Sequence, residues 1–298
     1  MIFDLSFLDL ELEAARTGVV SSRLLAHPTF DAIARHEAEL GRPAWEEASF
    51  RARFQAAAAG DTAGGHDWGL APLFRSREGL TQWRNWMADR GEELTGQVGR
   101  QLERFTSAPQ RPDLRCVPYV GSYDAGFALD VGDGAIYLNL PLFSCFEAFL
   151  QTLVHESFHA RVVCPETARR VQAVNAHPDP MVRLLSIAAE EGIAHIVGYD
   201  GATSTQFPTI SIRDAQTGAS ELKDLLARCH SGRISGQEAL DAFLHTDCCY
   251  SGGGYMAHSV WQALGRDGLD LWSAQGNLKE YYGAFCATPQ GADWPAVP

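Results

Sequence analysis

The stretch LVHESFHARVV, Leu153 to Val163, carries two histidines four residues apart and a glutamate directly after the first one. Residues four apart on an α-helix lie on one face, so His155 and His159 can place two imidazole nitrogens on one metal ion. Glu156 would then point beside the ion, where a general base for a metal-activated water is needed. A single rigid turn of helix would fix the mutual geometry of these three side chains.

The residues around the two histidines predict that this helix is mostly buried. Apolar side chains flank the histidines on both sides: Leu150, Leu153, Val154, Phe158 and Val162. Buried histidines need polar partners, which favours a metal site over a solvated helix face that happens to hold two histidines. We expect this helix to begin after an N-cap at Ser144, with Glu147 as its capping partner, and to end before Pro165.

A third ligand is needed, because catalytic zinc usually takes three protein ligands and keeps one position open. The candidates lie in AAEEGIAH, Ala188 to His195. A helical projection places Glu190 in the only polar sector of this helix and Glu191 among apolar residues. A carboxylate on an apolar face needs a cation, so Glu191 is the predicted ligand. Glu190 is expected at the surface or in contact with a metal ligand without binding the ion itself. His195 either orients a ligand or is a hydrogen-bonded core histidine.

The stretch CCYSGGGYMAHSVWQAL, Cys248 to Leu264, has three glycines directly before a predicted helix. Such glycines permit close backbone approach and would leave free N–H groups at the start of the helix. Tyr255 and His258 would lie near its first turn, where a side chain can donate a hydrogen bond to a developing oxyanion. Tyr255 is the first choice for this role and His258 the second. The alternative is a flexible loop followed by a packed tyrosine.

The order of the predicted elements favours an α+β fold that is mainly helical. The segment AGFALDVGDGAIYLNLPLF predicts a β-hairpin turning at Gly132-Asp133-Gly134, so a small antiparallel sheet should precede the HESFH helix. A further strand is expected over 115–120. Apolar periodicity predicts helices over the following ranges: 21–40, 44–59, 79–105, 181–197, 220–230, 236–244, 255–264 and 277–285. Residues 1–110 form a predicted N-terminal helical region and 111–298 the metal-binding region, or the two are one continuous domain.

Composition excludes several classes of partner. The chain has 298 residues and a net charge of −13, which disfavours binding to nucleic acid or anionic lipid. The N-terminus lacks the basic start and unbroken apolar run of a secretory signal, and no window is apolar enough for a membrane span. The seven cysteines are irregularly spaced, as expected of reduced thiols in a cytoplasmic protein. The sequence does not indicate the oligomeric state.

HESFH followed by EEGIA on a later helix resembles the gluzincin zinc metallopeptidases, whose pattern is HExxH and then a downstream glutamate. The wider pattern, including AHPTFDAIARHEAELGR and GGGYMAHSV, resembles families of uncharacterised zinc-dependent peptidases. The resemblance implies a zincin-like fold, a zinc ion on His155, His159 and Glu191, and a substrate backbone beside an edge strand. The separation of His159 from Glu191 is longer than in the thermolysin-like and aminopeptidase types, so the intervening residues must loop out.

These residues indicate a zinc-dependent hydrolase, acting on a peptide or protein, with Glu156 as general base. Two histidines and one carboxylate also form the facial triad of non-haem Fe(II) oxygenases. A 2-oxoglutarate-dependent peptide hydroxylase would need an arginine for its cosubstrate, such as Arg161 or Arg183. A third alternative is a binding protein without catalysis on a zincin scaffold.

Overall fold

The computed structural model describes residues 1–43, 45–61, 67–129, 134–199, 212–244, 246 and 248–295. The predicted hairpin turn at 132–133 lies outside these ranges. The chain forms two compact units, of which the first combines residues 1–98 and 111–160 and the second combines 99–110 and 161–298. Within the described ranges, no helix is both long and apolar enough to cross a bilayer. The fold is a mainly helical α+β fold, as the sequence predicts.

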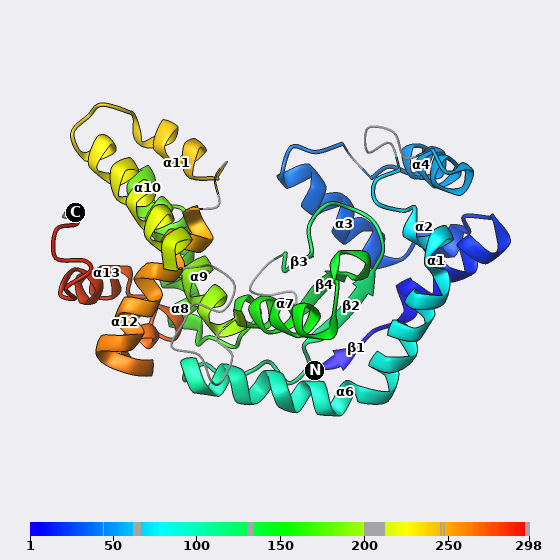
Figure 1. Ribbon diagram of the computed structural model, residues 1–298, viewed down its shortest axis with the longest axis horizontal. Helices are drawn as coiled ribbons and strands as arrows, with labels where there is room; N and C mark the ends of the chain where they lie inside the picture. The colour runs from blue at the N-terminus through cyan, green and yellow to red at the C-terminus, as the bar shows by residue number, and fades with distance from the viewer. Residues whose placement is uncertain are drawn as a thin grey trace. The chain divides into compact units, whose positions relative to one another are not determined.

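The first unit contains a small sheet and most of the helices that precede α7 (Figure 1). Helix α6 continues from Val98 in this unit to its end in the second unit. The elements in chain order are β1 Ile2–Phe3, α1 Ser6–Thr17, α2 Ser22–Leu25, α3 Pro28–Glu39, α4 Glu47–Ala59, α5 Pro72–Arg75, α6 Arg77–Phe105, β2 Arg115–Tyr119, β3 Gly126–Phe127, β4 Ala135–Asn139, the 3₁₀ turn η2 Leu140–Leu142 and α7 Phe146–His159.

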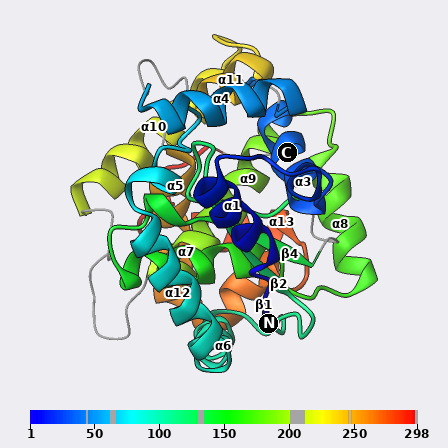
Figure 2. The same ribbon diagram turned by 90° about the vertical axis from the view of Figure 1, so that its right-hand side faces the viewer.

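The four strands form one mixed sheet in the order β1-β2-β4-β3. Strands β1, β2 and β4 run parallel, and they lie side by side in Figure 2. The predicted hairpin is present, because β3 pairs antiparallel with β4 and Gly126 lies opposite Leu138. The prediction of an antiparallel sheet is therefore wrong for the other strands. β3 occupies the outer edge of the sheet, which leaves β2 as the inner neighbour of β4, and β2 and β4 run in the same direction.

Helix α7 carries the HESFH motif, and aromatic side chains hold it in place. The ring of Phe149 lies 5.2 Å from that of Trp83 on α6 and 5.4 Å from that of Phe143. The N-cap is Cys145 and not the predicted Ser144, and it makes no side-chain cap bond. The helix ends at His159, earlier than predicted. The backbone N–H of Val162 instead donates to the carbonyl of Pro109, which takes it out of any helical hydrogen bond.

The predicted helix over 21–40 is two helices in the structure. α2 ends at Leu25 and α3 begins at Pro28. His27 between them is extended, with ψ 136°, because the ring of a following proline disfavours helical backbone in the residue before it. Nδ1 of His27 caps α3 by accepting from the N–H of Thr29. The helices predicted over 44–59 and 79–105 correspond to α4 and α6.

The second unit consists of helices. They are α8 Pro165–Asn175, α9 Pro180–Tyr199, α10 Ile212–His230, α11 Gly236–Leu244, α12 Cys248–Ser273 and α13 Leu278–Cys286. The residues that had to loop out after the HESFH motif thus fold in part as α8. Asp179 accepts from the N–H of Met181 at 2.9 Å, which confirms the predicted start of α9. α9 continues two residues past the predicted end at 197, and Gly198 is buried within it.

The three glycines of the Cys248 to Leu264 stretch lie inside α12, not in a loop before a helix. They are buried, and they let α12 pack directly on α9 and α10. A Cβ on Gly192 of α9 would lie 2.2 Å from the carbonyl of Gly253. A Cβ on Gly252 would lie 2.7 Å from the carbonyl of Gly218 on α10. The expected free N–H groups are therefore absent at these glycines, whose role is close helix packing.

Candidate metal centre

His155 and His159 converge on the last turns of α7. Their Nε2 atoms lie 3.2 Å apart, and the two rings are nearly perpendicular at 73°. His155 is buried and His159 is half-buried. Two imidazole nitrogens bound to one tetrahedral zinc at 2.0–2.1 Å are expected at about 3.3 Å from each other. The separation therefore fits two ligands on one ion, and it also fits a hydrogen bond between the two rings.

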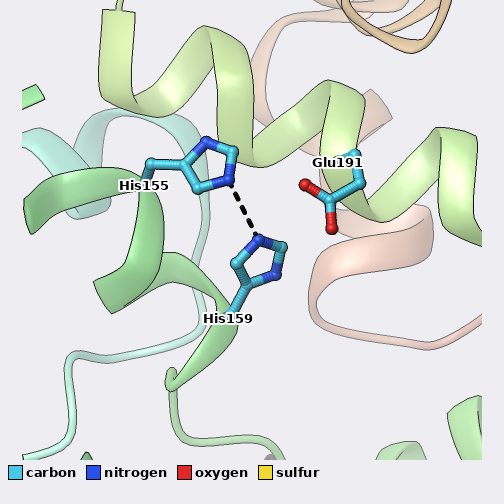
Figure 3. Close-up of side chains that lie close together, drawn as sticks. All are labelled: His155, His159 and Glu191. Carbon is cyan, nitrogen blue, oxygen red and sulfur yellow. Dashed lines mark hydrogen bonds between the residues drawn. The ribbon is translucent and has the colours of Figure 1, made fainter. Parts of the chain in front are cut away.

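Glu191 of α9 completes the group. One ligand atom from each of His155, His159 and Glu191 lies within 4.8 Å of the others (Figure 3). Two imidazoles and one carboxylate are hard-to-intermediate donors that suit zinc and also suit Fe(II). The structure thus brings together the three residues chosen from the sequence, in a group that could hold a metal ion.

Glu156 is buried beside the edge of the sheet. Only 7% of its surface is exposed. Strand β3 passes close to it at a glycine, because a Cβ on Gly126 would lie 3.1 Å from Cγ of Glu156 and 3.0 Å from Cγ2 of Thr152. The absence of a side chain at Gly126 therefore lets the outermost strand lie directly against the helix that carries the motif.

Glu190 occupies a different environment from that of its neighbour Glu191. Its carboxylate accepts two hydrogen bonds from the guanidinium of Arg161, at 2.6 and 3.0 Å. It accepts a third, at 2.8 Å, from the indole N–H of Trp272 on α12. This engagement makes Glu190 a structural ion-pair partner, in keeping with the choice of Glu191 as the candidate ligand.

The remaining predicted residues lie in the second unit. His195 is buried on α9 with its ring 4.6 Å from that of Tyr199. Tyr255 is half-buried and lines a hollow that also contains Lys223 and Trp294. His258 is half-buried one turn further along α12. Their proposed roles, as ligand orienter and as oxyanion donors, stay predictions.

A second group with metal-binding side chains lies in the first unit: His36, Glu37 and Asp124. Arg42 already occupies it, with bonds of 2.7 and 3.0 Å to the two oxygens of Asp124 and 3.3 Å to Glu37. Burial alone would raise the pKa of Asp124, but His36 and Arg42 outweigh it and lower that pKa to about 2. A fixed guanidinium at this position disfavours a cation, so we interpret the group as an ion-pair network.

This network anchors the loop that leads into β3. Asp124 lies two residues before Gly126, and the His36 ring stacks on Phe127 with centroids 3.9 Å apart. Within the same loop, Ser122 has a positive φ of 70° and donates to the buried carboxylate of Glu37. The N-terminal helix α3 therefore holds the strand that lies against Glu156. Sequence reasoning missed this role, because nothing in the spacing of these residues marks it.

No protein-family model, no curated protein and no solved structure matches this chain. The functional assignment therefore depends on the residues of the site and on their geometry.

Proposed function

We propose that this protein is a zinc-dependent hydrolase of the gluzincin type that cleaves peptide bonds. The observation that carries the proposal is the grouping of His155, His159 and Glu191, with Glu156 next to the first histidine on α7. His155, His159 and Glu191 would hold the ion. A bound zinc ion supplies Lewis acidity and lowers the pKa of a water molecule.

The protein's own groups supply the proton transfers. The Glu156 carboxylate takes a proton from the attacking water and delivers it to the leaving amine. Tyr255 or His258 is proposed to donate a hydrogen bond to the oxyanion. A substrate backbone is proposed to lie along β3, whose outer edge has no strand partner within the described sheet.

The structure disfavours the oxygenase alternative in one respect. A 2-oxoglutarate carboxylate needs an arginine, and Arg161 is the candidate two residues after His159. Its guanidinium is 4% exposed and is bound to Glu190 and to the carbonyl of Ser273. Arg183 donates to Gln237 at the start of α9. Recruiting Arg161 for a cosubstrate would therefore break the ion pair of a buried arginine, which is costly.

The experiment combines metal content with peptide turnover. Elemental mass spectrometry on protein purified without added metal should find about one zinc per chain, and this zinc should be lost in Glu191→Ala. A fluorogenic peptide library should then be cleaved by the wild type and left uncleaved by Glu156→Gln, which keeps the metal. Glu190→Ala removes a carboxylate from the same turn of α9 without removing a proposed ligand, so it should retain more metal than Glu191→Ala.

Each result has a defined meaning. Iron in place of zinc, with oxygen-dependent turnover that survives Glu156→Gln, would favour the peptide hydroxylase. Stoichiometric zinc without cleavage of any peptide would favour a binding protein on a zincin-like scaffold. No metal after reconstitution would mean that the two histidines share only a hydrogen bond, and the proposal would be wrong.

A further inference from the structure

We infer that Arg161 is a positioning residue for the metal centre, because it clamps Glu190 and thereby orients the adjacent Glu191. The inference rests on the proposed metal site and adds a residue to which the HExxH pattern assigns no role. It explains how a carboxylate thirty-two positions after His159 can be held at the site.

The clamp is largely shielded from solvent, with Arg161 4% and Glu190 20% exposed, and its geometry is specific. The Arg161 guanidinium and the Glu190 carboxylate make two parallel hydrogen bonds, and Nε of Arg161 donates to the Ser273 carbonyl at 2.9 Å. A planar fork of this kind fixes direction as well as distance, which a lysine ammonium cannot do. Trp272 adds the third donor to Glu190. Glu190 is thereby fixed from two sides, by the segment after α7 and by α12.

Fixing Glu190 also fixes Glu191. Successive residues on a helix point about 100° apart, so the direction of one carboxylate determines the sector of the next. Gly192 follows directly and abuts the backbone of Gly253, which prevents α9 from rotating or shifting at this point. The residue before Glu191 is held by the clamp and the residue after it by the glycine contact. The Glu191 side chain can therefore move only by rotation about its own χ angles.

The position of Arg161 in the chain makes the clamp relevant to the histidines. Only Ala160 separates Arg161 from His159. The backbone therefore links His159 to Arg161 across one residue. The ion pair then links Arg161 to Glu190, which is the sequence neighbour of Glu191. The ion pair therefore closes the segment from Arg161 to Glu190, which includes α8, within the second unit.

The test measures zinc affinity by competition with a chromophoric chelator, and it records the visible absorption of the Co²⁺-substituted protein. Arg161→Lys keeps the charge but loses the fork, and Glu190→Gln keeps the shape but loses the charge. We expect each to weaken zinc binding about 10- to 100-fold and to change the Co²⁺ spectrum. Asp270→Asn is the control. This buried carboxylate bonds to Thr106 and Ser107, so its loss should reduce stability without changing the spectrum.

A double-mutant cycle separates positioning from general destabilisation. If Arg161 acts through Glu191, then Arg161→Lys should cost less than about twofold in the residual zinc affinity of the two histidines, measured with added zinc, once Glu191→Ala is present. Wild-type affinity and spectrum in both single variants would overturn the inference while leaving the metal site intact. The inference would also be overturned if Arg161→Lys reduced zinc affinity as much in the presence of Glu191→Ala as in the wild type. If Arg161→Lys does not fold, Glu190→Gln and Trp272→Phe carry the test. Absence of zinc binding by the wild type would instead refute the metal site itself.

Discussion

Cγ of Glu156 lies 3.1 Å from the position that a Cβ atom on Gly126 would occupy. The edge strand and the proposed general base are therefore in close contact, and no space is left between them for a methyl group. The neighbouring atoms, on Leu138 and Thr152, are equally close at 2.9 and 3.0 Å.

Gly126→Ala should therefore displace Glu156 and reduce peptide hydrolysis. A displacement of a fraction of an ångström at a catalytic group can lower kcat about 10- to 100-fold. Metal content should stay at the wild-type level, because the atoms nearest to the new methyl lie on Leu138, Thr152 and Glu156 and not on His155 or His159. Gly79→Ala in α6 is the matched control, since its Cβ would meet nothing within 4 Å. Unchanged kcat in Gly126→Ala would show that the contact does not position Glu156.

Gly192→Ala should destabilise the second unit strongly. The new methyl would lie 2.2 Å from backbone atoms of Gly253, which cannot move as a flexible side chain can. Overpacking of this kind costs about 1–3 kcal/mol or more. Gly283→Ala in α13, with open space around it, should instead stabilise the protein by about 0.5–1 kcal/mol. Urea denaturation of both variants measures the difference, and equal midpoints would contradict the close helix packing.

Glu11→Gln should remove a pH dependence of stability. Glu11 is fully buried on α1, and burial raises its pKa well above 4.5 although the N–H of Val120 donates to it. The folded state thus holds a proton that the unfolded state loses above pH 4.5, so wild-type stability falls as pH rises from there towards the folded pKa. The glutamine variant lacks this loss. Chemical denaturation at pH 5 and pH 8 measures this effect. The free energy of unfolding of the variant, relative to that of the wild type, should be higher at pH 8 than at pH 5.

Asp124→Asn tests the ion-pair network that holds β3. The lowered pKa of Asp124, about 2, means that its contribution to stability is complete above 3.8 and is lost as pH falls towards 2. The variant should be less stable than the wild type at pH 7 by about 1–2 kcal/mol, after discounting for partial solvent exposure. The two stabilities should converge between pH 4 and pH 2. A constant difference across this range would mean that the carboxylate's charge is not what stabilises the loop.

The sequence predicts the local features of this protein well. The HESFH helix and α9 follow from apolar periodicity, and the hairpin before α7 follows from its turn residues. The choice of Glu191 over Glu190 follows from a helical projection. These features depend on residues that are close in sequence, which is why a single sequence can reveal them.

Long-range relationships were not predictable in the same way. The parallel pairing of β1 with β2 joins residues more than a hundred positions apart, and short strands carry no signal for a partner. The glycines of α12 resemble a loop in sequence, because a buried helix interface and a flexible turn both select for small residues. Arg161 is a candidate for a cosubstrate carboxylate in the sequence, and its ion pair with Glu190 is visible only in space.

The contact between Gly192 and Gly253 bears on which ions the proposed centre can accept. Backbone atoms in direct contact can hardly be compressed. α9 therefore cannot shift to accommodate a larger ionic radius. On the α9 side of the proposed centre, rotation of the Glu191 side chain would then supply the adjustment. The fit of the centre to zinc over a larger ion such as cadmium would then depend in part on two residues that have no side chains at all.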